Sequence, residues 1–214
     1  MKTWRKIAAF DIDAQKGFTP LCPDELPVSG GDKIVPELNF MASLASLRIG
    51  SKDAHPQNAV WVVDSKDEML AELEYPNADR TWVRHCEPGT KGFELLDGLP
   101  VVTDYDYFIW KGMEPDIHPY GACYHDIVEQ LSTGVLEYLR EQKVDLVLVG
   151  GLAFDFCVKT TVIQLSRAGF SVLVYLPATR ALSEQGFDET KEQLANTEKV
   201  QLIETREELV AYCQ

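Results

Sequence analysis

Short apolar runs that alternate with longer amphipathic stretches constrain the fold of this chain more than any other feature. The apolar runs have the length of buried strands and lie at residues 6–12, 107–110, 145–149, 171–176 and 200–203, with a further short strand ending at 51–53. Helical patterns lie between them at residues 35–47, 124–142, 157–168, 188–195 and 205–213. This alternation indicates an α/β fold, a mainly parallel sheet with helices on both faces, in one domain over residues 1–214.

The connecting segments are less regular. Residues 19–31 are rich in Pro, Gly and Asp and are predicted to form a loop. We expect Asp32 to cap the helix that follows, and Thr205 to cap the last helix. Residues 57–98 show the weakest pattern, with one acidic helix-like piece near residues 68–74.

Composition excludes several classes of protein. Hydrophobic residues make up 45% and charged residues 25%, as in ordinary soluble domains. The longest apolar runs are far shorter than the about 18 residues that span a membrane, and Asp11 and Asp13 interrupt the apolar start, so we expect a cytoplasmic protein without a signal peptide. A net charge of −14 argues against nucleic acid as a partner. Five cysteines without a CxxC pair indicate reduced thiols. The sequence leaves homo-oligomer formation open.

Reactive side chains follow three of the predicted strands. Asp11 and Asp13 end the first strand, Lys111 ends the 107–110 strand, and Cys157 follows the 145–149 strand at a helix start. Ligands bind beyond the carboxyl ends of parallel strands, so these groups should meet at one edge. A helix start and a nearby cation would lower the pKa of the thiol, and a carboxylate could take its proton. A buried structural cysteine and a solvated lysine are the ordinary alternatives.

A second group of side chains has the spacing of metal ligands. Asp53 and His55 are two residues apart, so on an extended segment both point to one face. With His85 they could hold one divalent ion and leave positions open for water. Solvated loop residues would explain the same pattern. His118 and His125 have no such partner and are expected to be ordinary surface or helix histidines.

Four blocks of sequence follow one another in the order of a known family. Residues 10–18 (FDIDAQKGF) are similar to D-x-Q-x-x-F, and residues 51–56 (SKDAHP) to S-x-D-W-H-P. Residues 82–92 (WVRHCEPGTKG) are close to W-P-x-H-C-x-x-x-T-x-G. Residues 110–112 (WKG) and 151–158 (GLAFDFCV), the latter similar to G-[LIV]-A-x-D-x-C-V, form the fourth block. With these blocks the chain resembles the nicotinamidase/isochorismatase superfamily of cysteine hydrolases, and within it the nicotinamidases.

The resemblance implies a catalytic triad. Its members are Asp13 rather than Asp11, together with Lys111 and Cys157. An oxyanion hole would come from the backbone N–H groups of Ala153 and Cys157, with a cis peptide bond before Ala153.

The resemblance also implies the substrate pocket and the metal. Phe18 and Trp82 would enclose a pyridine ring, and Tyr120 would help to close the pocket. A metal ion would be held by three residues and would bind the ring nitrogen or a water beside it; these residues are Asp53, His55 and His85. Zinc is the expected ion, while manganese and iron also suit one carboxylate and two imidazoles.

Three positions depart from the family pattern. Ala54 replaces a tryptophan that does not bind the metal. Many members have another histidine where this chain has Ala59, which leaves three protein ligands. Residues 57–81 are longer and less regular than in the family, so Trp82 and His85 depend on the W-x-x-H-C match.

The implied activity is hydrolysis of nicotinamide to nicotinate and ammonia through a cysteine thioester, a step of NAD salvage. Other ring carboxamides such as pyrazinamide remain open as substrates. One alternative is an amidase of the same superfamily that acts on a carbamoyl or ureido substrate. A true isochorismatase is disfavoured because it has no use for a cysteine nucleophile or a metal. A non-catalytic binding protein on the same scaffold is disfavoured because all three triad residues are present.

Overall fold

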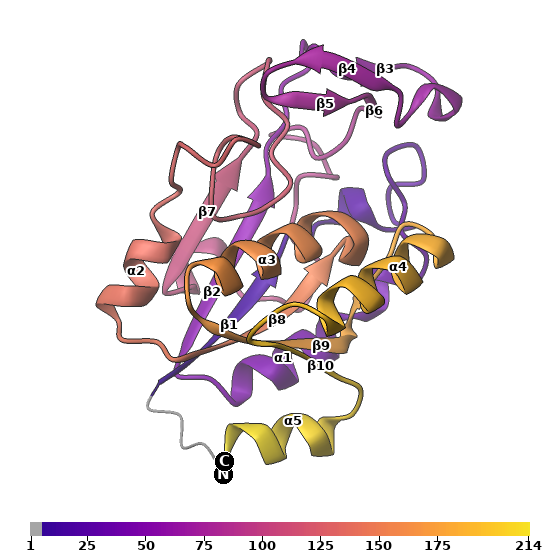
Figure 1. Ribbon diagram of the computed structural model, residues 1–214. Coiled ribbons are helices and arrows are strands. Elements are labelled where there is room, and N and C mark those ends of the chain that lie inside the picture. The colour runs from indigo at the N-terminus through magenta and orange to yellow at the C-terminus, as the bar shows by residue number, and fades with distance from the viewer. Residues whose placement is uncertain (1–5) are drawn as a thin grey trace.

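The computed structural model describes residues 6–214 and has a six-stranded parallel sheet at its centre (Figure 1). The strands lie in the order β10-β9-β8-β1-β2-β7. Their bounds are Ile7–Ile12 (β1), Leu47–Asp53 (β2), Tyr107–Lys111 (β7), Leu146–Leu152 (β8), Ser171–Arg180 (β9) and Val200–Ile203 (β10). Every neighbouring pair in this sheet is parallel. The predicted α/β fold is confirmed.

Within the described residues, five α-helices cover the two faces of the sheet. They are Val35–Ser43 (α1), Val135–Glu141 (α2), Lys159–Arg167 (α3), Glu184–Ala195 (α4) and Arg206–Cys213 (α5). Buried side chains of α1 and α5 share one apolar core, and those of α2, α3 and α4 share the other (Figure 1). Strand β1 alternates between the two cores, with Ala9 in the first and Ala8 and Phe10 in the second. All residues of β1 and β8 are buried, which explains their unbroken apolar character.

A smaller group of elements lies above the sheet in Figure 1, formed mainly by the irregular segment after β2. Val62–Val63 (β3) pairs in parallel with Trp82–Val83 (β6), and Glu72–Tyr75 (β4) forms an antiparallel pair with Ala78–Arg80 (β5). Short 3-10 helices occupy Lys16–Phe18, Gly31–Lys33, Lys66–Glu68 and Val102–Asp104. The acidic piece at residues 68–74 is therefore a 3-10 turn and a strand, and the prediction of a helix there is wrong.

Two other helix predictions need correction. Helix α1 ends at Ser43 because the chain enters β2 four residues later, and Asp32 lies in a 3-10 turn without capping α1. Only Val135–Glu141 of the predicted 124–142 helix is helical. The Asp126 carboxylate accepts hydrogen bonds from the backbone N–H groups of Gln130 and Leu131 at 2.9 and 3.0 Å, which stabilises a loop instead.

The C-terminal helices agree better with the sequence. A π-helical turn at Phe154–Val158 precedes α3, so Cys157 lies in that turn rather than at the start of a regular helix. Helix α4 begins at Glu184, earlier than predicted, because the Ser183 hydroxyl accepts a hydrogen bond from the Gly186 N–H. Thr205 caps α5 as predicted, in a reciprocal arrangement with Glu208.

One glycine fixes how closely two central strands approach. Gly151 in β8 pairs with Ile12 in β1 and has a φ of +127°. A Cβ atom at this position would lie 1.9 Å from the Ile12 carbonyl oxygen, so only glycine fits. This contact brings the Ala153–Cys157 turn next to the residue after β1, which is Asp13. Within residues 6–214, no helix is long and apolar enough to cross a membrane.

Candidate active site

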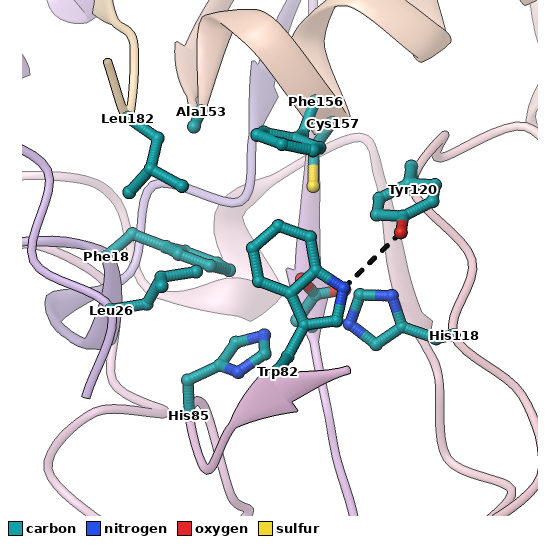
Figure 2. Close-up of a pocket in the computed structure, with 11 residues that line it drawn as sticks. Phe18, Leu26, Trp82, His85, His118, Tyr120, Ala153, Phe156, Cys157 and Leu182 are labelled. Carbon is teal, nitrogen blue, oxygen red and sulfur yellow. Dashed lines mark hydrogen bonds between the residues drawn. The ribbon is translucent and has the colours of Figure 1, made fainter. Parts of the chain in front are cut away.

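A pocket lies beyond the carboxyl ends of the central strands. Figure 2 shows the Cys157 sulfur atom pointing into it, opposite the indole of Trp82. Eleven residues line this pocket: Phe18, Leu26, Asp53, Trp82, His85, His118, Tyr120, Ala153, Phe156, Cys157 and Leu182. The pocket therefore contains predicted substrate, metal and catalytic residues together.

The three predicted triad residues converge on one point. Lys111 ends β7, and its Nζ lies 3.1 Å from Asp13 Oδ2 and 3.8 Å from Cys157 Sγ. Asp13 follows β1 with a φ of +44°, and its Oδ1 accepts a 2.6 Å hydrogen bond from the Ser51 hydroxyl. Asp13 and Lys111 are fully buried, and Cys157 is 5% exposed. A buried thiol, carboxylate and ammonium at these distances can exchange protons without bulk water.

Asp11 belongs to a different cluster from Asp13. Its Oδ2 forms an ion pair with Arg48 at 2.7 Å and accepts a 2.9 Å hydrogen bond from the Tyr105 hydroxyl. The positive φ of Asp13 ends the regular alternation of β1, so the two carboxylates have separate partners although they are two residues apart. This separation supports Asp13, and not Asp11, as the residue beside the thiol.

The sequence predicted a lowered pKa for the Cys157 thiol, and the structure indicates the opposite. Burial raises the pKa of the Cys157 thiol well above its usual value, and the Lys111 ammonium only partly offsets this. Burial alone would lower the pKa of Lys111, but the charges of Asp13 and Asp53 hold it well above its usual value. Burial also raises the pKa of Asp13, against the influence of Lys111. These shifts favour a thiol over a thiolate at Cys157, beside a carboxylate whose raised pKa suits it to accept a proton.

Asp53 lies between the triad and a group of histidines. It ends β2, in register with Lys111 on β7, and its Oδ1 accepts a hydrogen bond from the Lys111 ammonium. Its Oδ2 lies 3.4 Å from His55 Nε2. Burial alone would raise the pKa of Asp53, but Lys111 and His55 outweigh that effect and lower it. The carboxylate is therefore ionised, as a metal ligand must be.

The Gln15 side chain holds Asp53 in place, a role that the sequence reasoning did not assign. Its amide accepts a 2.7 Å hydrogen bond from the Asp53 N–H and donates a 2.9 Å bond to the Asp53 carbonyl. Gln15 is fully buried. It was visible in the D-x-Q-x-x-F block, but only the fold shows which backbone it binds.

His55 and His85 are oriented as metal ligands. His55 Nδ1 lies 3.2 Å from the Gly112 carbonyl oxygen, and His85 Nδ1 lies 2.7 Å from the Val83 carbonyl oxygen. A carbonyl oxygen only accepts, so each Nδ1 carries the proton and each Nε2 offers a lone pair. Burial is the main cause that lowers the pKa of His85 to about 3, which keeps it neutral. A backbone carbonyl behind each imidazole is the usual support for a metal-binding histidine.

His118 is not the surface or helix histidine predicted from the sequence. It is 4% exposed, lines the pocket and stacks on both Trp82 and His55 (Figure 2). Atoms of His55, His85 and His118 lie within 4.8 Å of one another, a grouping that could hold a metal ion. His125 is partly exposed in a loop, in agreement with its prediction. No motif or spacing connects His118 to the other two histidines, so it could not be recognised from the sequence.

The pocket walls contain the predicted aromatic residues and others that were missed. The Tyr120 hydroxyl accepts a 3.3 Å hydrogen bond from the Trp82 indole and donates a 2.7 Å bond to Asp79, while Phe18 packs beside His85. Phe156 meets Trp82 edge-on at 4.9 Å. Leu26, Phe156 and Leu182 complete the apolar lining and were not predicted. Ala153, the other predicted oxyanion donor, lines the pocket after a cis peptide bond from Leu152.

Comparisons with known proteins identify the family of this chain. The family model of the isochorismatase domain matches residues 10–206. A nicotinamidase from Acinetobacter baylyi is 31% identical over 98% of this chain and 98% of its own length. The solved structure of an Acinetobacter baumanii nicotinamidase and pyrazinamidase has a TM-score of 0.81 at 27% identity, over 95% of this chain and 98% of that one. A Pyrococcus horikoshii pyrazinamidase solved in complex with zinc shares the fold, with a TM-score of 0.72 at 24% identity over 94% of this chain and 99% of that one. This chain therefore belongs to the isochorismatase-domain family, and its relatives there include nicotinamidases.

Proposed function

We propose that this protein hydrolyses nicotinamide to nicotinate and ammonia, with Cys157 as the nucleophile. The observation that carries the proposal is the buried cluster of Asp13, Lys111 and Cys157 at an aromatic pocket. The mainly apolar and aromatic lining, with Phe18 and Trp82 among its residues, suits a small planar ring. The relatives named nicotinamidase support the same substrate.

The first half of the reaction forms a thioester. The Cys157 sulfur attacks the carboxamide carbon while Asp13 takes the thiol proton. The backbone N–H groups of Ala153 and Cys157 stabilise the oxyanion that results. Asp13 then gives the proton to the amide nitrogen, the C–N bond breaks and ammonia leaves.

The second half releases the acid. Water attacks the thioester carbon while Asp13 accepts a proton from it. Asp13 then returns this proton to the sulfur as the C–S bond breaks, which restores the thiol of Cys157 and releases the acid. The Lys111 ammonium stays within 3.8 Å of both partners and stabilises the negative charge that moves between them. Phe18 and Trp82 would hold the ring, and Tyr120 would close the pocket beside Trp82.

We also propose that Asp53, His55 and His85 hold one divalent ion, with zinc as the first candidate. The structure fits such an ion because the Nε2 atom of His55 is buried and, among residues 6–214, has no hydrogen-bond partner. When bound, the ion would offer an open position to the ring nitrogen of the substrate or to a water molecule. The residues themselves keep the ring orientation fixed relative to Cys157.

The test is ammonia release from a panel of nicotinamide, pyrazinamide and a ureido compound. We expect turnover of nicotinamide by the purified protein and none by Cys157→Ala. Cys213→Ala is the matched control, because Cys213 is a free cysteine remote from the pocket lining. Turnover of the ureido compound alone would favour another amidase of this family, and no turnover of any amide would favour a binding protein.

A further inference from the structure

We infer that His118 is a third imidazole ligand of the proposed metal site, and that it supplies the coordination that Ala59 cannot. The inference rests on the metal site proposed above and goes beyond its three predicted ligands. It assigns the ion a set of three imidazoles from His55, His85 and His118, beside the carboxylate of Asp53.

The nitrogen atoms of the buried His118 ring lack partners among residues 6–214. The ring is 4% exposed, yet within the described chain neither of its nitrogen atoms has a hydrogen-bond partner. Buried polar atoms in folded proteins nearly always have a partner. One ring nitrogen of a neutral imidazole is an acceptor with a free lone pair, and that atom faces a cluster of two other imidazoles within 4.8 Å.

The other two histidines, His55 and His85, also have ring nitrogen atoms available to a ligand. Their Nδ1 atoms are occupied by the carbonyl oxygens of Gly112 and Val83, so their Nε2 atoms are left for a ligand. Three imidazoles could not satisfy one another here, because none of their ring-to-ring contacts is a hydrogen bond: the His55 and His118 rings stack at 4.9 Å with 18° between their planes. A shared cation satisfies all three at once.

The irregular segment after β2 holds His118 in position. The backbone N–H of His118 donates a 2.6 Å hydrogen bond to the carbonyl of Asn77, and the Trp61 indole donates a 3.0 Å bond to the carbonyl of Ile117. The rings of Trp61 and His118 meet edge-on at 4.4 Å. The segment that contains Ala59 therefore holds His118, which comes from a loop distant in sequence, beside His55 and His85.

The chemistry of the set defines the class of ion. Imidazole nitrogen with one carboxylate oxygen suits zinc, iron, cobalt and other first-row divalent ions, and is a poor set for magnesium or calcium. With three imidazoles as ligands, Asp53 can keep the contact of its Oδ1 with Lys111, while its Oδ2 lies 3.4 Å from His55 Nε2.

The first experiment counts imidazoles in the unmodified protein, without any need for catalysis. The protein is stripped with a chelator, reloaded with one equivalent of zinc, and studied by X-ray absorption spectroscopy. We expect scattering from three imidazole ligands. A fit with two imidazoles, or a protein that does not retain zinc, would overturn the inference.

The second experiment compares the zinc affinity of variants by competition with a chromophoric chelator. His118→Ala and His118→Phe should each raise the Kd for zinc more than about 100-fold, beyond what the loss of an outer contact costs. His118→Phe keeps a planar ring against Trp82, so it separates ligation from packing, and His125→Ala is the matched control that should bind zinc as the unmodified protein does. A Kd within threefold of the unmodified protein for His118→Phe would show that His118 only packs.

The outcomes distinguish this inference from the proposed function. Three imidazole ligands on zinc in a protein that does not hydrolyse nicotinamide would support the inference and contradict the proposed activity. Hydrolysis of nicotinamide by a protein whose zinc has two imidazole ligands would support the proposed activity and overturn this inference.

Discussion

The Lys111→Met substitution tests whether one ammonium group holds the catalytic charges together. The Nζ atom of Lys111 lies 3.1 Å from Asp13 Oδ2 and also donates to Asp53, and the side chains of Lys111 and Asp13 are fully buried. Methionine has a similar length, so the substitution removes the charge while it largely keeps the packing. Two buried carboxylates are then left without a cation.

The expected loss of stability is large. Removing one partner of a buried ion pair costs about 3–5 kcal/mol, and here two carboxylates lose their partner, so we expect the upper end, about 5 kcal/mol near neutral pH. Because small domains are stable by only about 5–15 kcal/mol, the variant should be marginally folded. Lys52→Met is the matched control: Lys52 is also buried in β2, but it lies 4.3 Å over the Phe93 ring and forms no ion pair with any residue in 6–214. Its loss should cost about 1 kcal/mol.

The stability loss should also depend on pH. In the unmodified protein Lys111 lowers the pKa of Asp53, so this carboxylate adds stability at pH values above its unfolded pKa and loses it as the pH falls through its folded pKa. In the variant, burial without the cation raises the pKa values of both carboxylates, Asp13 and Asp53. The folded variant then binds protons more readily than the unfolded chain, and its stability rises as the pH falls.

Urea unfolding at pH 7.5 and pH 5 measures both effects. We expect the difference in unfolding free energy between the unmodified protein and Lys111→Met to be smaller at pH 5. Ammonia release should be lost at both pH values, because without the Lys111 ammonium nothing stabilises the negative charge that moves between Asp13 and Cys157. A loss that is equal at the two pH values, or no larger than that of Lys52→Met, would refute the assignment of Lys111 as the shared counter-ion.

Three further predictions concern the same site. Asp13→Asn should lower kcat by about 10²–10⁴-fold, as expected for a lost acid–base group, while Asp11→Asn changes kcat only a few-fold; equal losses in steady-state kinetics would contradict the assignment. Gly112→Ala should lower the bound metal measured by elemental analysis, because its Cβ would lie 2.6 Å from His55 Cε1, whereas Gly89→Ala, also at positive φ but with nothing within 4 Å, should keep it. Chelation should raise KM more than it lowers kcat, with recovery on adding metal back, and full activity in metal-free protein would exclude a role for the ion.

The sheet and the convergence of Lys111 and Cys157 could be predicted because both depend on local sequence, whereas the choice of Asp13 depended on the family resemblance. Strands buried on both faces carry continuous apolar runs, and β1 and β8 are buried along their whole length. Lys111 directly ends such a strand, and Cys157 follows another, so a parallel arrangement was enough to bring them to one edge. Their pKa values were not predictable, since these depend on how many other charges burial brings together.

The helix predicted at 124–142 failed for a different reason. Its first half has an amphipathic pattern, but a pattern does not reveal a carboxylate that binds its own backbone. Asp126 does this with the N–H groups of Gln130 and Leu131, and Gly134 adopts a φ of +84° before the helix begins. The competing hydrogen bonds are local, so Asp126 in that sequence could have been recognised as a loop signal.

For Asp53, the sequence predicts a metal ligand, and only the structure shows its contact with Lys111. The D-x-H spacing predicts a metal ligand, and the position of Asp53 at the end of β2 agrees with it. Parallel pairing of β2 with β7 then places Asp53 opposite Lys111, a relation that links residues 58 positions apart. One carboxylate oxygen of Asp53 thus contacts Lys111 while the other lies near His55, so the proposed metal site and the proposed triad share a residue. A change in the charge held by the histidine cluster must therefore be felt at Lys111 and, through it, at the Cys157 thiol.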